Sequence, residues 1–144
     1  MKLATRLTLI GVPLLALAGF FAKSRANFAA LAASGFREEG GESVQEFFAN
    51  CIQRGSHPTQ ISECMPRGAS LDRFVAPTSD GDSLLLERYT YHAWGIGSWP
   101  VQIYYERGGG VNDFYAQDEW PSLYGARPVS GIEADQWRLA SKAL

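Results

Sequence analysis

The chain has 144 residues, of which 15 are acidic and 13 are basic, and its formal net charge at pH 7 is -2. This mild charge excludes the basic footprint of a nucleic-acid-binding protein and the acidic tail of a solvating segment. The length suits one domain of ordinary size once the N-terminus is set aside. Two cysteines are too few for a disulfide scaffold but enough for one bridge.

The N-terminus has the charge pattern of an exported or membrane-bound protein. Lys2 and Arg6 precede a predominantly apolar run over residues 7–22. Lys23 and Arg25 follow that run. A basic start before an apolar stretch is typical of an export signal or a short transmembrane helix. We therefore predict that residues 1–26 are a signal sequence or a membrane anchor and that the rest of the chain lies outside the cytoplasm.

Cleavage and retention of this segment both remain open. A helix over the apolar run would reach roughly 24 Å, short of the ~30 Å hydrocarbon core of a bilayer. That shortness and Pro13 favour a cleaved signal, and the small residues around Leu17 offer a cleavage site. The bulky pair Phe20 and Phe21 favours retention. The predicted location is accordingly either inner-membrane-anchored with the domain in the periplasm, or periplasmic or secreted after cleavage.

Residues 27–42 are predicted as a linker, although the alanine-rich part up to Ala33 could continue the first helix. A helix is then predicted from Ser43, because Ser43 and Glu46 are spaced as a capping box in which each side chain satisfies the other's backbone N–H. Apolar residues follow at helical spacing: Val44, Phe47, Phe48, Cys51 and Ile52. Gly55 stands where a left-handed helix stop is expected.

A second short helix is predicted between Pro58, which suits a first helical turn, and Pro66, which ends the helix. Cys51 and Cys64 fall on the apolar stripes of these two adjacent helices. In an exported protein, this proximity favours a Cys51–Cys64 disulfide that contributes roughly 3 kcal/mol by closing the loop. The alternative is a pair of small buried thiols in contact with the core.

The stretch over residues 84–116 organises the rest of the domain. Three runs rich in β-branched and aromatic residues alternate with two turns that contain glycine, which predicts a three-stranded antiparallel meander. Alternation within the first two strands places seven residues on one apolar face: Leu85, Tyr89, Tyr91, Ala93, Val101, Ile103 and Tyr105. The two predicted helices are expected to cover that face.

The C-terminal end is predicted to form a further helix. Ser130 and Glu133 are spaced as a second capping box, and one helical side would carry Ala134, Trp137, Ala140 and Leu144. Residues 67–83 are predicted to be irregular. The predicted fold class is therefore α+β: an N-terminal hydrophobic helix, two helices packed on a three-stranded antiparallel meander, and a C-terminal helix, with the domain spanning residues 43–144.

Residues associated with catalysis or metal binding are sparse. His57 and His92 do not combine with the two cysteines in any compact zinc spacing. Asp113, Asp118 and Glu119 follow or end a predicted strand, where acidic residues are usually solvated. We predict no catalytic residue, no metal site and no cofactor.

Aromatic residues gather around the predicted sheet. A thin domain with two short helices does not bury rings on both sheet faces, and exposed Tyr and Trp are typical anchors of protein interfaces. The predicted partner-binding residues are Trp94, Trp99, Tyr89, Tyr91 and Tyr104. The alternative is a satellite core in which the C-terminal helix covers the rings with Trp137.

The order of these features resembles a known family. Residues 55–61 read Gly-Ser-His-Pro-Thr-Gln-Ile, residues 89–91 read Tyr-Thr-Tyr and residues 101–105 read Val-Gln-Ile-Tyr-Tyr. Over Ser43–Ala116 this pattern resembles the SmpA/OmlA (BamE-like) small envelope proteins. The family's Leu-Gly before the helix-ending proline is replaced here by Cys64-Met65, and its lipid-bearing cysteine is absent. The resemblance implies a two-helix, three-strand layout that is also found in β-lactamase inhibitory proteins.

The predicted function is that of a non-enzymatic envelope protein, exported or membrane-anchored, that acts as an accessory or assembly factor through protein–protein binding. Its expected partners are another envelope or membrane protein and, through the N-terminal helix, a membrane, with no nucleic acid. The alternative is a secreted or periplasmic inhibitor of an enzyme that uses the same fold.

Overall fold

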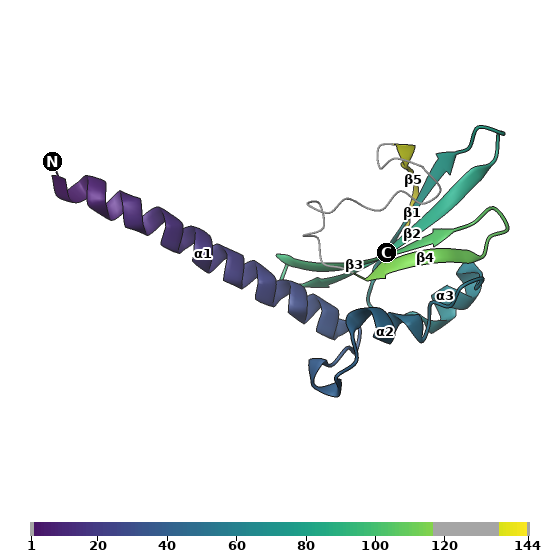
Figure 1. Cartoon of the computed structure of the whole chain (residues 1–144), viewed down its shortest axis with the longest axis horizontal. Helices are drawn as coiled ribbons and strands as arrows, with labels where there is room; N and C mark the ends of the chain where they lie inside the picture. The colour runs from purple at the N-terminus through teal and green to yellow at the C-terminus, as the bar shows by residue number, and fades with distance from the viewer. Residues whose placement is uncertain (1, 117–135, 144) are drawn as a thin grey trace.

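The computed structural model describes residues 2–116 and 136–143. A long N-terminal helix leads into an antiparallel sheet, and two short helices lie below the sheet in the view of Figure 1. The helical elements are α1 (Lys2–Ala33), the 3-10 turn η1 (Glu38–Gly40), α2 (Val44–Ala49) and α3 (Pro58–Cys64). The strands are β1 (Ser70–Pro77), β2 (Ser83–Ala93), β3 (Gly97–Tyr105), β4 (Val111–Ala116) and β5 (Arg138–Ala143).

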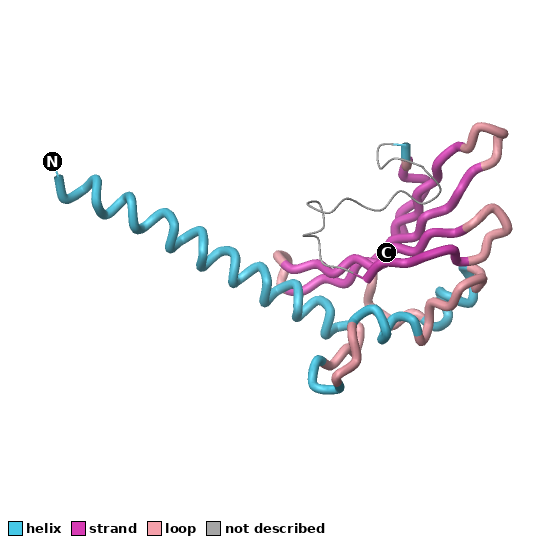
Figure 2. Tube along the Cα trace, in the orientation of Figure 1, coloured by secondary structure: helices cyan, strands magenta, loops and turns pink. Residues whose placement is uncertain are grey.

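The α+β class is confirmed, but the predicted three-stranded meander is wrong. The sheet has five antiparallel strands in the order β4-β3-β2-β1-β5, and Figure 2 shows them as one layer of magenta strands. The three predicted runs coincide with β2, β3 and β4. β1 forms where the sequence predicts an irregular stretch, so the domain has a wider sheet than expected.

The predicted C-terminal helix is also wrong, because residues 138–143 form β5. β5 pairs with β1, which has a free edge once β2 occupies its other side. Alanine-rich segments favour helix in isolation, but pairing with a sheet edge outweighs local propensity. The predicted capping box at Ser130 and Glu133 lies outside the described residues.

The sequence does not predict β1, because two charged residues interrupt its alternation. Asp72 and Arg73 are adjacent, so the segment lacks the alternating apolar and polar pattern of an amphipathic strand. In the sheet, Arg73 lies directly opposite Glu87 of β2, and the Arg73 Nε lies 2.7 Å from Glu87 Oε1. A cross-strand ion pair of this kind stabilises pairing but leaves no apolar signal in either strand alone.

α1 continues through the alanine-rich stretch and ends at Ala33, as the sequence allows. Its 32 residues span about 48 Å. Among its described side chains, those over residues 12–33, the buried ones are Ala26, Asn27, Ala30 and Leu31. The N-terminal part of the rod projects away from the sheet (Figure 1). The segment predicted as a linker therefore includes the buried end of a helix.

The capping box of α2 is confirmed. Ser43 Oγ accepts from the backbone N–H of Glu46 at 3.1 Å, and the Glu46 carboxylate accepts from the backbone N–H of Ser43 at 2.8 Å. α2 is shorter than predicted because it ends at Ala49, with Asn50 as its C-cap. Gly55 is thus not the helix stop. It has a φ of 82° in the following turn, where its N–H donates to the carbonyl of Val111 at 2.8 Å.

The core lies on both faces of the sheet. The face towards the helices holds the main cluster, which includes Leu31, Phe48, Ile61, Tyr91, Trp99, Val101, Ile103 and Tyr105. The opposite face holds a smaller cluster in which Leu86 and Tyr104 are buried and Phe74, Tyr115 and Trp137 pack against them. Aromatic rings therefore cover the second face without the predicted C-terminal helix.

Candidate functional site

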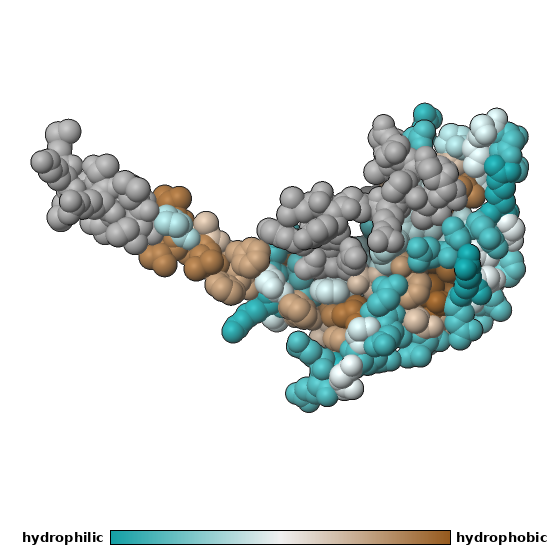
Figure 3. All heavy atoms as spheres, in the orientation of Figure 1, coloured by the Kyte–Doolittle hydropathy of each residue, from teal (hydrophilic) through white to brown (hydrophobic). Residues whose placement is uncertain are grey.

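α1 presents a long apolar surface to solvent. The large apolar side chains between Val12 and Phe21 are 49–76% exposed, and Figure 3 shows them as a brown section of the rod. They are Val12, Leu14, Leu15, Leu17, Phe20 and Phe21. Because successive residues turn by about 100° around a helix axis, these positions are distributed around α1 and do not form one stripe. A helix that is apolar on all sides is typical of burial in lipid or protein.

A transmembrane helix, which the sequence predicts as one possibility, is not found: in residues 2–116 and 136–143, no helix combines the length and the apolarity that crossing a bilayer requires.

The C-terminal end of α1 is fixed against the start of β3. The backbone of Ala26 lies so close to Gly97 that a Cβ atom at Gly97 would collide with it. The Asn27 side-chain oxygen accepts a hydrogen bond from the backbone N–H of Ser98 at 3.1 Å. The two groups are buried, so this bond holds α1 in one register on the strand.

The turn between β2 and β3 is exposed and apolar beside this contact. Trp94 is 74% exposed and Ile96 is 59% exposed. The Ile96 N–H donates to the carbonyl of Ala93 at 3.3 Å, which closes the turn. Trp94 has a φ of 54° and Gly95 a φ of 71°. Trp94 is the only non-glycine residue with a positive φ among the described residues, a conformation that side chains other than Asn and Asp rarely adopt.

Of the five residues predicted to bind a partner, the structure exposes Trp94 and buries the others. Trp99 is 7% exposed, and its ring lies 6.0 Å from that of Phe28. Tyr91 is fully buried, and its hydroxyl donates to the carbonyl of Pro66 at 2.9 Å. A direct contact between these buried rings and a partner would require the core to open. Trp99 and Tyr91 are placed as core residues.

The other two predicted rings are buried in different clusters. Tyr89 packs in the main core, beside Glu87. Tyr104 lies on the opposite sheet face, where its ring centroid is 6.0 Å from that of Trp137 and its hydroxyl donates to Gln102 at 2.9 Å. The partner-binding role therefore stays a prediction. Of the five residues, Trp94 is the one whose side chain is accessible to a partner. Ile96, which the sequence reasoning did not single out, joins Trp94 at the exposed turn.

A buried carboxylate, Glu87, forms a polar network that sequence reasoning missed. Its side chain has no solvent exposure. Tyr105 donates to Glu87 Oε2 at 2.8 Å, Tyr89 donates to the same oxygen at 3.4 Å, and Arg73 donates to Oε1 at 2.7 Å. The sequence offers one indication of this burial: Glu87, Tyr89 and Tyr91 are alternate residues of one strand, so Glu87 lies on the apolar face. A charged residue at such a position requires buried partners.

The network changes the acid–base properties of its tyrosines. Burial raises the pKa of Tyr105 far above its ordinary value, and the neighbouring Glu87 raises it further. The pKa of Tyr89 is raised for the same two reasons. The pKa of Arg73 is raised chiefly by its hydrogen bond to Glu87. Phenols with raised pKa values remain protonated donors at neutral pH, so the network acts as fixed internal hydrogen bonding.

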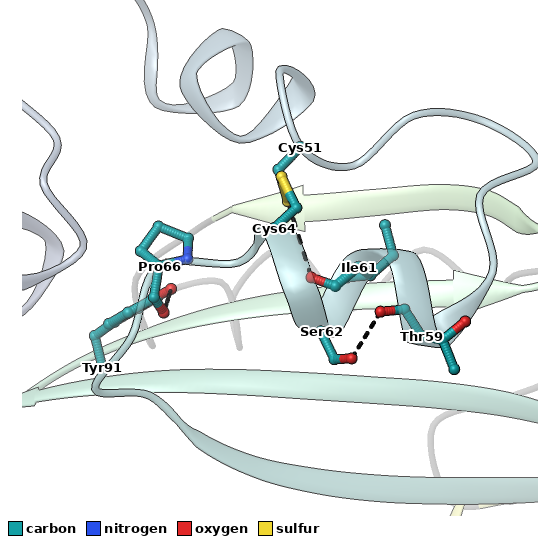
Figure 4. Close-up of a disulfide and its surroundings, with 7 residues drawn as sticks. All are labelled: Cys51, Thr59, Ile61, Ser62, Cys64, Pro66 and Tyr91. Carbon is teal, nitrogen blue, oxygen red and sulfur yellow. Dashed lines mark hydrogen bonds between the residues drawn. A yellow bond between two sulfur atoms is a disulfide. The ribbon is translucent and has the colours of Figure 1, made fainter.

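The predicted Cys51–Cys64 disulfide is confirmed, with the two Cα atoms 5.6 Å apart. Figure 4 shows the bridge joining the end of α3 to the segment after α2. Cys51 is half-buried and packs against the main core, whereas Cys64 is exposed. The expectation that both cysteines lie on buried faces is therefore wrong for Cys64.

The two histidines lie at separate structural positions. His57 precedes α3, where its backbone N–H donates to Gln60, and His92 of β2 has its Nε2 3.1 Å from Ser70 Oγ. Within the described residues, no group of three or more His, Cys, Asp or Glu side chains is placed to hold a metal ion. Asp113 accepts from the backbone N–H of Phe114 at 2.8 Å. Asp118 and Glu119 lie outside the described residues.

At the end of the sheet opposite the β2–β3 turn, the β1–β2 and β3–β4 turns line an open hollow of about 540 Å³. It is lined by Pro77, Thr78, Ser79, Leu84, Glu106, Arg107, Gly108 and Gln136. Arg107 forms an ion pair with Asp80, which joins the two turns. The hydrogen bonds from Thr78 and from Arg107 hold the pKa of Asp80 below its usual value. These contacts describe a solvated link between turns.

Comparison with protein-family models, with curated proteins and with solved structures found no match for this chain.

Proposed function

We propose that this chain is a non-enzymatic envelope protein that is exported from the cytoplasm and held at a membrane by α1. Its α+β domain acts as an accessory or assembly factor by binding another envelope protein. The observation that carries the proposal is the exposed apolar surface of α1 between Val12 and Phe21. The resemblance to the SmpA/OmlA proteins supports the same class of function.

The apolar surface of α1 calls for a covering partner. Contiguous exposed apolar surfaces are uncommon on soluble monomers and mark contact with protein or lipid. The apolar residues of α1 are distributed around its axis, and the sequence is basic on both sides of them, at Arg6 and Lys23. Basic residues beside an apolar segment favour a membrane with anionic lipids.

The buried carboxylate of Glu87 fits a structural role better than a catalytic one. The buried carboxylate of Glu87 is occupied by donors from Tyr105, Tyr89 and Arg73. The hollow at the far end of the sheet is lined by residues that do not include Glu87. Glu87 is thus positioned as a structural group and not as a general base facing a substrate cavity.

A secreted or periplasmic enzyme inhibitor is the second candidate, and one observation favours it. Cleavage after Ala18 would remove most of the exposed apolar segment and leave Ala26, Asn27 and Leu31 buried against the sheet. The folded domain would therefore keep all of its described core after cleavage.

The test uses the full chain with alkaline phosphatase fused after Leu144. Cells are fractionated, the recovered chain is sequenced from its N-terminus, and a photo-crosslinking residue at exposed positions of the domain captures its neighbours. We expect an active phosphatase, recovery with membranes, an intact N-terminus and one defined envelope protein as the crosslinked partner. A Leu14→Glu and Leu15→Glu variant should leave the membrane fraction, because two charges enter the apolar segment.

A matched control adds a charge elsewhere. Gln60→Glu changes an exposed position of α3 and should stay with membranes. An inactive phosphatase fusion would contradict export. A soluble chain that begins at Gly19 and crosslinks to an enzyme whose activity it suppresses would replace the proposal with the inhibitor.

A further inference from the structure

We infer that the exposed turn of Trp94 and Ile96 is a second lipid-contacting element, seated at the membrane–water interface beside the point where α1 leaves the domain. This inference rests on the proposed function, because it requires α1 to hold the chain at a membrane. The structure carries it through the relative direction of α1 and β3, the charges beside the turn and the backbone conformation of Trp94.

The contacts between α1 and β3 give the direction. Ala26 meets Gly97, Asn27 bonds to Ser98, and the ring of Phe28 lies 6.0 Å from that of Trp99. Both segments therefore advance in the same direction over this contact.

The turn precedes Gly97, so it lies towards the N-terminal side of Ala26 along α1, which is the side that carries the exposed apolar segment. Figure 1 shows this end of the β2–β3 pair beside α1, where the helix leaves the sheet. The turn that carries Trp94 and Ile96 thus lies towards the same end of α1 as that segment.

Two exposed basic residues of α1 lie close to the turn along the helix axis. Lys23 and Arg25 are exposed, and they stand between the apolar segment that ends near Phe21 and the Ala26 contact with the sheet. At 1.5 Å per residue, Lys23 lies about 4.5 Å along the axis from Ala26. Insertion of the apolar segment would place both cations among lipid headgroups, where an anionic surface attracts basic residues.

The backbone conformation of the turn supports a contact role for Trp94. Trp94 and Gly95 both have positive φ, as tight hairpin turns of the I′ type require, and Asn, Asp or Gly usually fill the first of these positions. A left-handed backbone conformation is unfavourable for most side chains. A strained and exposed tryptophan is unfavourable on both counts in the isolated domain, which points to a role in binding.

Lipid fits this turn better than a protein pocket does. Tryptophan is enriched at membrane–water interfaces because its ring is apolar and its N–H is polar. Ile96 adds an aliphatic side chain to the same turn. Along α1, the apolar segment is followed by the basic residues Lys23 and Arg25, near which the turn lies. This order of apolar and basic groups matches the order of acyl chains and anionic headgroups in one leaflet.

The test measures tryptophan fluorescence of the full chain reconstituted in vesicles of phosphatidylcholine and phosphatidylglycerol. Vesicles whose acyl chains carry bromine near the headgroup quench tryptophans that enter the interface. We expect wild-type emission to fall on brominated vesicles and Trp94→Phe to lose most of that quenching. Trp137→Phe is the matched control and should keep it, because Trp137 packs against Tyr104 on the other sheet face.

Two further variants separate contact from folding and charge. Trp94→Asn should raise the melting temperature, because asparagine tolerates the left-handed conformation, and should still abolish the quenching difference. Lys23→Gln with Arg25→Gln should reduce quenching on anionic vesicles and leave it unchanged on vesicles of phosphatidylcholine alone.

The outcomes distinguish this inference from the proposed function. A chain that sediments with vesicles but shows equal quenching in wild type and Trp94→Phe overturns the lipid contact and leaves the membrane role of α1 intact. A chain that does not sediment with vesicles overturns the membrane part of the proposed function and the inference with it. Unquenched Trp94 together with loss of a crosslinked protein partner in Trp94→Asn would assign the turn to protein binding instead.

Discussion

The hydroxyl of Tyr105 donates a 2.8 Å hydrogen bond to Oε2 of Glu87, and both side chains are buried on the helix-covered face of the sheet. A carboxylate in this position is tolerated only if its oxygens are satisfied. Tyr105 and Tyr89 supply donors to one oxygen and Arg73 to the other, so three strands contribute to one network. The network fixes β1, β2 and β3 in a common register, because a shift by one residue would separate the partners.

The first prediction concerns the strength of this network. Glu87→Ala should lower the free energy of unfolding by about 2–3 kcal/mol, because it leaves the hydroxyls of Tyr105 and Tyr89 without an acceptor. Arg73→Ala should lower it by about 3 kcal/mol or more, because the side chain of Glu87 has no solvent exposure and its buried charge loses the paired guanidinium. Urea unfolding measures both. A loss of about 1 kcal/mol or less for Arg73→Ala would show that the phenol hydrogen bonds, and not the ion pair, hold the buried carboxylate.

The second prediction concerns alkaline pH. The pKa values of Tyr89, Tyr91 and Tyr105 are raised in the folded chain, chiefly by burial. A raised folded pKa means that the folded state binds the proton more tightly, so this stability is fully present at neutral pH and falls as the pH rises above about 10.

The phenolate absorbance of these three buried tyrosines should therefore appear in one cooperative step together with unfolding. Tyr105→Phe should make that step less steep, because one fewer buried proton is released. Gradual ionisation of all tyrosines before any loss of circular dichroism would contradict the prediction.

The sequence predicts local elements well where the signal is contained within one segment. The capping box of Ser43 and Glu46 forms because both partners lie in the first turn of α2. The disulfide joins cysteines only 13 residues apart, at the end of α3 and in the segment just after α2. β2, β3 and β4 follow from their own alternation and from the glycines between them.

Features that depend on distant partners are not predicted. The strand character of β1 follows from the pairing of Arg73 with Glu87, and that of β5 from the free edge of β1. The same limit applies to the candidate site. Trp94 and Trp99 look alike as neighbours of one turn, and they differ because α1 covers Trp99 through Phe28. The residue pattern over 94–99 cannot predict which of these tryptophans is covered by a helix some 70 residues earlier in the chain.

The third prediction concerns the disulfide. Because Cys64 is exposed, a reductant should open the Cys51–Cys64 bridge in the folded chain, after which both thiols react with an alkylating reagent. Cys51→Ser with Cys64→Ser should lower the free energy of unfolding by about 3 kcal/mol, as expected for a loop of this length. Mass spectrometry of alkylated protein and urea unfolding measure the two effects. Two alkylated cysteines in unreduced protein from its native compartment would contradict the bridge.

The fourth prediction concerns the contact between α1 and the sheet. Gly97→Ala should separate α1 from β3, because the new methyl group would collide with the backbone of Ala26. Backbone atoms within a helix cannot rotate away as the end of a flexible side chain can. The melting temperature should fall, and amide hydrogens of Ala26 to Leu31 should exchange faster. Gly108→Ala is the matched control, since nothing lies within 4 Å of its Cβ position and its φ is not positive. Unchanged exchange in Gly97→Ala would show that α1 is not held at this point.

The fifth prediction separates the two tryptophans that flank the β2–β3 turn. Trp99→Ala should destabilise the chain by about 3–5 kcal/mol, because it empties a buried site between α1 and the sheet. Trp94→Ala should change the free energy of unfolding by no more than about 0.5 kcal/mol, because an exposed side chain contributes little packing. Thermal and urea unfolding of the full chain in detergent compare the two variants, and recovery with vesicles reports their binding. Two variants that both destabilise the chain would place Trp94 in a satellite core. Two variants that both leave stability unchanged would remove Trp99 from the core and reopen it as a binding residue.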